Sequence, residues 1–292
     1  MRYSIENKFL KVEVDAAGAQ LKSVYSKQSG VEYLWQGDPA YWTGSAPNIF
    51  PTVGRMYKNI YTYEGNTYSL RTHGVARYYA YKMFARTATK LVFLLEANED
   101  TLKEYPFRFA FYAIFELFGS ELKVSYKVKN EDEKEMIFSV GGHPGINVPF
   151  AGGNFEDYYI EFAEKTNVTH RLLSENMFMS GKVATYPLED GVRLPLEHQL
   201  FDNDAIVLSN TCREVAIKTT VSDSCVKMKY YDFKFFGLWH APKTDAPYVC
   251  LEPWSALPAT EGVIDDLSTK EDMAKIKAGE EKTFSYTLEI CE

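Results

Sequence analysis

Hydrophobic and polar residues alternate with a period of two over several stretches of this chain. The clearest stretch is 122–128, where leucine, valine and tyrosine alternate with lysine and serine. Residues 10–15 and 284–290 repeat the pattern. Because successive side chains of a strand point to opposite faces, this alternation predicts half-buried β-strands. Two nearly continuous apolar runs, 91–95 and 109–117, predict strands covered on both faces.

Turn signals rich in glycine, asparagine and acidic residues separate these strands. They fall at 64–66, 98–100, 130–132, 152–154 and 202–204. The one candidate helix is 268–277, with Ser268 as the N-cap, Glu271 three residues later and Gly279 past the end.

Many strands with almost no helix predict an all-β fold, a sandwich or barrel rather than alternating strands and helices. No proline-rich linker, low-complexity tract or internal repeat divides the 292 residues. We therefore expect one β-sandwich domain over residues 1–292.

Composition and charge exclude several classes of partner. The 21 tyrosines and 19 phenylalanines favour strands and can line a sugar site. The net charge of −8, without a basic stripe, argues against a nucleic-acid partner. The start of the chain lacks the apolar core of a signal peptide, and no run approaches the ~20 apolar residues of a membrane span. We expect a cytoplasmic protein with no membrane partner, and leave monomer and homodimer equally open.

The four cysteines are widely scattered and show no paired spacing for zinc. They are Cys212, Cys225, Cys250 and Cys291. In a cytoplasmic chain they are expected to be free thiols, and we predict no metal site.

The most informative residues are a carboxylate and an imidazole, each directly before a proline. Glu252 precedes Pro253 in an apolar run, and His143 follows two glycines and precedes Pro144. Proline biases the preceding residue towards extended backbone, so both side chains are expected to project from strand ends. An acid and a base held in this way can move a proton across a small substrate.

Alternation along the strand places Glu252 on the same face as Tyr248 and Cys250, opposite Val249 and Leu251. A carboxylate buried among such neighbours must be paired or have a raised pKa. The simpler interpretations are a strand-end glutamate that points into water and a turn histidine that is hydrogen-bonded to backbone.

Arg55 and His73 form a second polar group that can donate hydrogen bonds to hydroxyl and ring oxygens. Arg55 follows a loop with two prolines and a glycine, and His73 closes what is predicted to be the next hairpin. Taken singly, an arginine of this kind is more often a surface charge, and such a histidine is more often a hydrogen-bonded turn residue.

Asp202 and Asp204 precede an apolar run, and a strand-capping turn is the simpler interpretation for Asp202. Trp239 and His240 are candidate substrate-binding residues, and Trp254 is a candidate stacking wall. The motifs of phosphate loops, dinucleotide folds, zinc hydrolases and serine nucleophile elbows are absent.

In its order of motifs, the chain resembles the aldose 1-epimerase (galactose mutarotase) family, and within it the LacX-like branch. The resemblance runs nearly end to end. It rests on residues 48–55, His73-Gly74, Gly142-His143-Pro144, 201–208 and 238–254. The family implies a β-supersandwich with a sugar site on its concave face and no cofactor.

By this resemblance Glu252 is the expected general base and His143 the general acid of an aldose 1-epimerase. Arg55 and His73 match residues that hold the sugar's oxygens, and Asp204 matches an aspartate that binds hydroxyls. Such an enzyme removes the proton of the anomeric hydroxyl and protonates the ring oxygen of a hexose, and then closes the ring to the other anomer.

Three other functions stay open from the sequence. A glycosidase would use two carboxylates, for which Glu252 and Asp204 are available. A catalytically inactive carbohydrate-binding protein would keep the pocket without turnover. A hexose-6-phosphate mutarotase would need a cation for the phosphate, and Arg77, Lys58 and Arg71 are the candidates.

Overall fold

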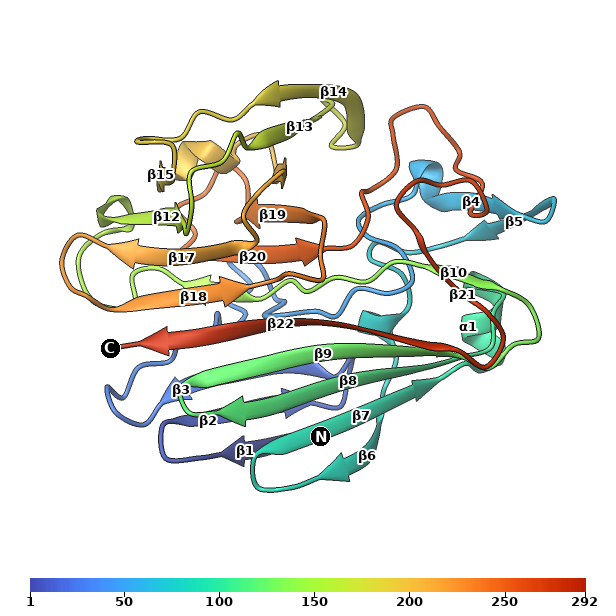
Figure 1. Ribbon diagram of the computed structural model, residues 1–292, viewed down its shortest axis with the longest axis horizontal. Helices are drawn as coiled ribbons and strands as arrows, with labels where there is room; N and C mark the ends of the chain where they lie inside the picture. The colour runs from blue at the N-terminus through green and yellow to red at the C-terminus, as the bar shows by residue number, and fades with distance from the viewer.

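A computed structural model describes residues 1–292, and every ladder between its strands is antiparallel (Figure 1). The largest sheet has nine strands. In sheet order they are β15 (Arg193–Pro195), β12 (Tyr158–Phe162), β17 (Glu214–Thr219), β18 (Cys225–Lys229), β22 (Glu281–Cys291), β9 (Glu121–Asn130), β8 (Phe109–Phe118), β7 (Lys90–Glu96) and β6 (Lys82–Arg86).

A second sheet of six strands carries the polar residues singled out near the C-terminus. Its strands are β11 (Gly145–Asn147), β20 (Tyr248–Trp254), β19 (Phe235–Trp239), β16 (Ile206–Ser209), β13 (Thr169–Leu173) and β14 (Met179–Thr185). In Figure 1, β19 and β20 lie above the long strands β22, β9 and β8.

Three smaller sheets complete the fold. They are β1 (Arg2–Glu6), β2 (Leu10–Asp15) and β3 (Gln20–Ser26); β4 (Ile60–Tyr63) with β5 (Asn66–Ser69); and β10 (Met136–Phe138) with β21 (Ala274–Ile276). Tyr3 on β1 packs edge-on against Phe93 on β7 at 5.6 Å, which joins the N-terminal sheet to the nine-stranded one.

Helical structure is limited to one α-helix, α1 (Glu99–Glu104), and short 3₁₀ turns. The turns are η1 (Tyr57–Asn59), η2 (Ala76–Tyr78), η3 (Phe155–Asp157) and η4 (His198–Phe201). Neither α1 nor these turns are long and apolar enough to span a membrane. The expected all-β fold with little helix is confirmed.

The period-two stretches form the predicted half-buried strands. Along β2, β9 and β22, the apolar positions are buried while the polar positions between them are mostly partly exposed. Their inward residues, such as Val12, Val124 and Leu288, belong to one cluster of 65 buried residues. Strand β7 is covered on both faces as predicted. Strand β8 is not, because Tyr112, Ile114 and Glu116 are only partly buried.

The predicted helix at 268–277 is wrong. Residues 274–276 form β21, which pairs with β10, and Asp272 ahead of it has a φ of 60° that no right-handed helix accommodates. Ser268 donates its backbone N–H to Asp266 in a turn, so it caps no helix. Pairing with β10 and burial of Ile276 outweigh a helix signal that rested on caps alone.

The observed helix begins at one of the predicted turns. Asn98 Oδ1 accepts hydrogen bonds from the backbone N–H groups of Asp100 and Thr101, and Thr101 Oγ1 accepts one from Asn98 N–H. This reciprocal capping box stabilises a helix start. The turn at 64–66 is confirmed, because Glu64 and Gly65 both have positive φ between the paired residues Tyr63 and Asn66.

Candidate active site

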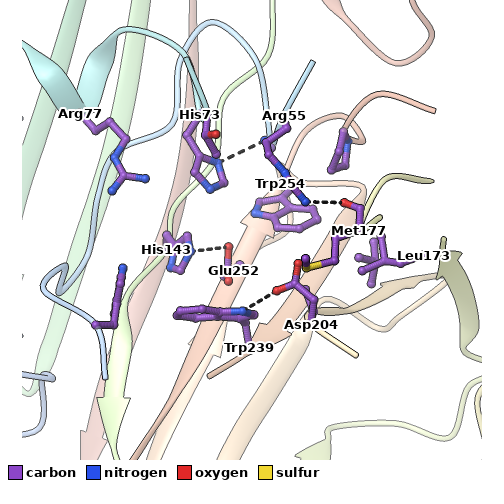
Figure 2. Close-up of a pocket in the computed structure, with 16 residues that line it drawn as sticks. Arg55, His73, Arg77, His143, Leu173, Met177, Asp204, Trp239, Glu252 and Trp254 are labelled. Carbon is purple, nitrogen blue, oxygen red and sulfur yellow. Dashed lines mark hydrogen bonds and ion pairs between the residues drawn. The ribbon is translucent and has the colours of Figure 1, made fainter. Parts of the chain in front are cut away.

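A cavity of about 380 Å³ opens over the six-stranded sheet (Figure 2). This volume lies in the range of about 300–1,000 Å³ that is typical of small-molecule sites. Its lining residues are Trp42, Gly54, Arg55, Thr72, His73, Arg77, His143, Leu173, Met177, Asp204, Ala205, Val207, Trp239, Glu252, Trp254 and Pro258.

Glu252 projects into this cavity from β20 and is only 2% exposed. As predicted, Val249 and Leu251 belong to the main core, whereas Cys250 packs with aromatic residues on the opposite face. On the neighbouring strand Gly237 lies opposite Glu252. A Cβ at Gly237 would approach Glu252 Cβ to 3.2 Å, so the glycine leaves room for the carboxylate.

His143 reaches the same place from the segment that leads into β11. Gly145 pairs with Cys250, and Leu251 N–H donates to Pro144 O at 3.0 Å. Continuing that register by two residues sets His143 opposite Glu252. Their side chains point toward each other in Figure 2, with Nε2 3.2 Å from Oε2.

The two glycines before His143 serve packing within the protein. A Cβ at Gly141 would lie 2.9 Å from the ring of Trp254, and one at Gly142 would lie 2.6 Å from Tyr286. Neither glycine lines the cavity. Close approach of backbone to side chains, rather than to a ligand, therefore explains the Gly-Gly sequence.

Burial shifts the pKa of the Glu252 carboxyl group and the pKa of the His143 imidazole in opposite directions. It raises the pKa of Glu252 well above the usual value, and the carboxylate of Asp204 raises it further. Burial lowers the pKa of His143 to about 3, and the Arg77 guanidinium acts in the same direction. Both shifts disfavour the charged forms, so between these two pKa values the pair is expected to hold one proton and no net charge.

Several buried polar atoms at this point have no hydrogen-bond partner in the protein. They are His143 Nδ1, Glu252 Oε2 and Trp254 Nε1. Glu252 Oε2 is close enough to His143 to form an ion pair, but the contact lacks hydrogen-bond geometry. Unpaired buried polar groups are costly, and they are common where a ligand completes the bonding.

His73 is held by a strained loop beside the pair. Its φ is 66°, and its Nδ1 accepts a hydrogen bond from Gly54 N–H at 3.2 Å. That bond leaves Nε2 as the protonated nitrogen of the neutral ring. Burial, reinforced by His143, lowers the pKa of His73 well below its usual value, so the ring is a neutral donor.

Gly74 is required for this loop. Its φ is 76°, and an added Cβ would lie 2.2 Å from Phe50 O. We expect Gly74→Ala to lower the free energy of unfolding by about 3 kcal/mol or more, from left-handed strain plus overlap with backbone. Gly65→Ala is the matched control, because Gly65 has the same φ of 76° and open space around it. The control should lose about 1–2 kcal/mol in denaturant titration, and equal losses would contradict the packing argument.

Arg55 lies across the cavity from His143 and is tied to a hairpin. Its Nη2 donates to the carbonyls of Asn176 and Met177, each at 3.2 Å, and its guanidinium lies 5.0 Å from the ring of Phe178. These residues belong to the connection between β13 and β14. The hairpin therefore closes one side of the site and positions the arginine.

Asp204, not Asp202, enters the cavity. Its Oδ1 accepts a hydrogen bond from Trp239 Nε1 at 2.7 Å, which fixes both side chains (Figure 2). Burial raises its pKa above the usual value. Trp239 and Trp254 also line the cavity.

His240 does not line the cavity. It is fully buried behind Trp239, where its Nδ1 donates to Ala241 O at 2.8 Å and its Nε2 lies 3.2 Å from His198 Nδ1. Alternation along the strand turns neighbouring residues to opposite faces, so only one of Trp239 and His240 can face the cavity.

Trp42 is the main lining residue that the sequence did not reveal. Its ring stacks on His143 at 4.9 Å and meets Trp239 edge-on at 5.4 Å. It lies in a segment without periodicity, so its only signal is a tryptophan among turn residues. Leu173 and Met177 were missed for a similar reason, because the β13–β14 hairpin folds over the site.

Of the three cations considered for a phosphate, only Arg77 lines the cavity. Arg71 forms a two-point contact with Glu104 away from it, and Lys58 is exposed in η1. The site therefore combines a buried acid–base pair, hydrogen-bond donors and acceptors, and aromatic walls. Such a set can bind a polyhydroxylated ring and transfer protons within it.

The aldose 1-epimerase family model matches residues 1–289. The chain is 29% identical over 299 aligned positions to the chromosomal protein LacX of Lactococcus lactis subsp. lactis, covering 99% of both chains. A galactose mutarotase related enzyme from Lactobacillus acidophilus superposes with a TM-score of 0.94 at 34% identity, covering 100% of this chain and 98% of that one. A galactose mutarotase-like protein from Lactobacillus casei gives 0.94 at 29% identity, covering 100% of both chains.

The fold is therefore galactose mutarotase-like, and the resemblance read from the sequence motifs is confirmed over the full chain. The chain belongs to the aldose 1-epimerase family.

Proposed function

We propose that this protein is an aldose 1-epimerase that interconverts the α and β anomers of a hexose. The observation that carries the proposal is the contact of 3.2 Å between His143 Nε2 and Glu252 Oε2, buried at the base of the cavity. Two groups that share one proton suit a reaction that removes a proton at one oxygen and adds one at another.

The reaction returns the pair to its starting state. The step starts from the form of the pair in which the shared proton lies on His143 and Glu252 is ionised. Glu252 takes the proton of the anomeric hydroxyl, His143 gives its proton to the ring oxygen, and the bond from C1 to that oxygen breaks. After rotation about C1–C2, the C5 hydroxyl attacks the other face of the aldehyde. His143 takes the hydroxyl proton and Glu252 returns its proton to the new anomeric oxygen, so no further reactant is needed.

The remaining lining residues would hold the ring during this cycle. Trp42 and Trp239 offer aromatic surface for the apolar face of a sugar. The Arg55 guanidinium, His73 Nε2–H and the Asp204 carboxylate offer the donors and acceptors for its oxygens. Galactose or glucose is the proposed substrate.

Polarimetry on freshly dissolved α-galactose and α-glucose tests this function. The purified protein is expected to accelerate the approach to anomeric equilibrium in proportion to its concentration. An inactive carbohydrate-binding protein would instead bind the sugar in calorimetry and leave the rate of mutarotation at its uncatalysed value.

A specific observation favours a second candidate, a mutarotase for a phosphorylated hexose. Arg77 lines the cavity, and its guanidinium makes no hydrogen bond or ion pair within the protein. The guanidinium lies 5.3 Å from the ring of Tyr78. A free guanidinium at a substrate site is suited to an anionic group.

Arg77→Gln decides between the two substrates. If the substrate is phosphorylated, kcat/KM for hexose 6-phosphate should fall by about 10–150-fold, the value of one hydrogen bond to a charged group. If it is a free aldose, kcat/KM for glucose should change by less than about fivefold. Arg71→Gln is the matched control, since Arg71 is paired with Glu104 outside the cavity. A large loss in the control would show that the effect is not local.

A further inference from the structure

Three potential metal ligands converge at the base of the cavity. They are His143, Cys250 and Glu252, whose ligating atoms all lie within 4.8 Å of one another. The three residues are 7%, 0% and 2% exposed. Alternation along the strand predicted that Cys250 and Glu252 share a face, but the approach of His143 depends on the register between β11 and β20.

The spacing is close to that of a tetrahedral zinc site. Zinc binds nitrogen and oxygen at roughly 2.0–2.2 Å and thiolate sulfur at about 2.3 Å, so adjacent ligands in a tetrahedron lie roughly 3.3–3.6 Å apart. His143 Nε2 and Glu252 Oε2 are already 3.2 Å apart. Because all three ligand atoms lie within 4.8 Å of one another, Cys250 Sγ must approach the other two by about 1.2 Å or less (4.8 less 3.6) to reach this spacing.

The donor set selects the kind of ion. A thiolate with an imidazole and a carboxylate suits Zn²⁺ and its spectroscopic substitute Co²⁺, whereas Mg²⁺ and Ca²⁺ prefer oxygen ligands alone. The protein leaves Glu252 Oε2 and His143 Nδ1 without hydrogen-bond partners, although both are buried. The cavity lies beside Glu252 and His143 and leaves a fourth position open to water or a sugar hydroxyl.

We propose that His143, Cys250 and Glu252 bind one Zn²⁺ ion, and that this ion inhibits the protein. The inhibition rests on the function proposed above, because the metal occupies the lone pairs through which Glu252 and His143 exchange protons. On binding, the Cys250 S–H bond breaks and a metal–sulfur bond forms, while the thiol proton and the proton held by the Glu252–His143 pair both pass to solvent. Cys250 does not line the cavity, so it takes no part in the reaction itself.

Metal binding is tested without any assay of activity. The native chain should bind one Co²⁺ with the near-ultraviolet charge-transfer band of a cobalt–thiolate bond, and Zn²⁺ should displace it. Cys250→Ala and Cys250→Ser should both lose the band and weaken Zn²⁺ binding in calorimetry by ~100-fold or more, since loss of even an outer-shell partner costs 10–100-fold. Unchanged Zn²⁺ affinity in both variants would overturn the site.

Cys291→Ser is the matched control. Cys291 pairs in register with Cys225 on the neighbouring strand, so these two thiols form a second pair of ligands for a thiophilic ion. The control should keep the band and the affinity of the native chain. Loss of the band in Cys291→Ser but not in Cys250→Ala would place the ion at the wrong cysteines and refute the proposal.

Polarimetry then separates the metal site from the proposed function. Zn²⁺ should abolish mutarotation by the native chain, a chelator should restore it, and Cys250→Ala should keep its basal rate within about threefold while resisting the same Zn²⁺ concentration by ~100-fold. Zn²⁺ binding that depends on Cys250, in a protein without mutarotase activity, would uphold the site and refute only the function. Equal inhibition of the native chain and Cys250→Ala would refute the inhibitory role.

Discussion

Glu252→Gln and His143→Asn are each expected to lower kcat by about 10²-fold or more and to change KM only modestly. Glutamine keeps the size of Glu252 but cannot accept the anomeric proton. Asparagine keeps a polar group at 143 but cannot deliver a proton to the ring oxygen. Both lost interactions act mainly in the transition state, so binding of the ground state should change little.

The double variant provides the stronger test. Because the two side chains are in contact at 3.2 Å, they should act as one unit, and the double variant should lose much less than the product of the single losses. His170→Asn is a matched control, since His170 lies on β13 and does not line the cavity. A single variant within threefold of the native rate would remove that residue from the mechanism.

Thermal unfolding separates a catalytic effect from damage to the fold. Glu252 is buried with a raised pKa, so its folded form binds a proton that the unfolded chain releases as pH rises above the ordinary carboxyl range. Stability from this group is present at low pH and declines as pH rises. Glu252→Gln should therefore unfold at a higher temperature than the native chain at pH 8, with a smaller difference at pH 5. A variant less stable at pH 8 would contradict the burial argument.

The strands were predictable because their signal is local. Alternation in 122–128 and 284–290 predicts which side chains are buried, and the burial pattern of β9 and β22 agrees with it. Strand β8 departs from its prediction because an apolar run does not show whether one or both faces of a strand are covered. Tyr112 and Ile114 lie on a face of β8 that is only partly buried. The false helix at 268–277 shows the limit of capping signals, because the pairing of β21 with β10 spans more than a hundred residues.

The acid and the base were predictable as candidates but not as a pair. Pro253 and the apolar run marked Glu252, and Pro144 with its glycines marked His143, yet only the register of Gly145 with Cys250 brings the two side chains opposite each other. Trp42 carried no signal beyond being a tryptophan among turn residues, because its place depends on the path of a long loop. The same limit hid Cys250 as a possible ligand, since its strand face was predictable and its partner across the sheet was not.

The second large effect that we expect is on the pH dependence of kcat/KM. The shape of this pH profile follows from the proton that Glu252 and His143 share. The native chain should show a bell-shaped profile, because the pair is inactive when it holds two protons and when it holds none. The two limbs belong to the pair rather than to single residues. Since burial lowers the pKa of His143 to about 3 and raises that of Glu252, the two limbs should be set widely apart.

Each single variant should keep one limb of this profile. The group that remains decides whether kcat/KM rises or falls with pH. In His143→Asn only the base is left, so kcat/KM should rise with pH as Glu252 ionises, and the limb should lie above the ordinary carboxyl pKa because burial raises it. In Glu252→Gln only the acid is left, so kcat/KM should fall as pH rises through the lowered pKa of His143. Polarimetry from pH 2 to 10, corrected for uncatalysed mutarotation, covers both limbs, since the lower one lies near the His143 pKa of about 3. A bell retained in either variant would show that other groups carry the protons.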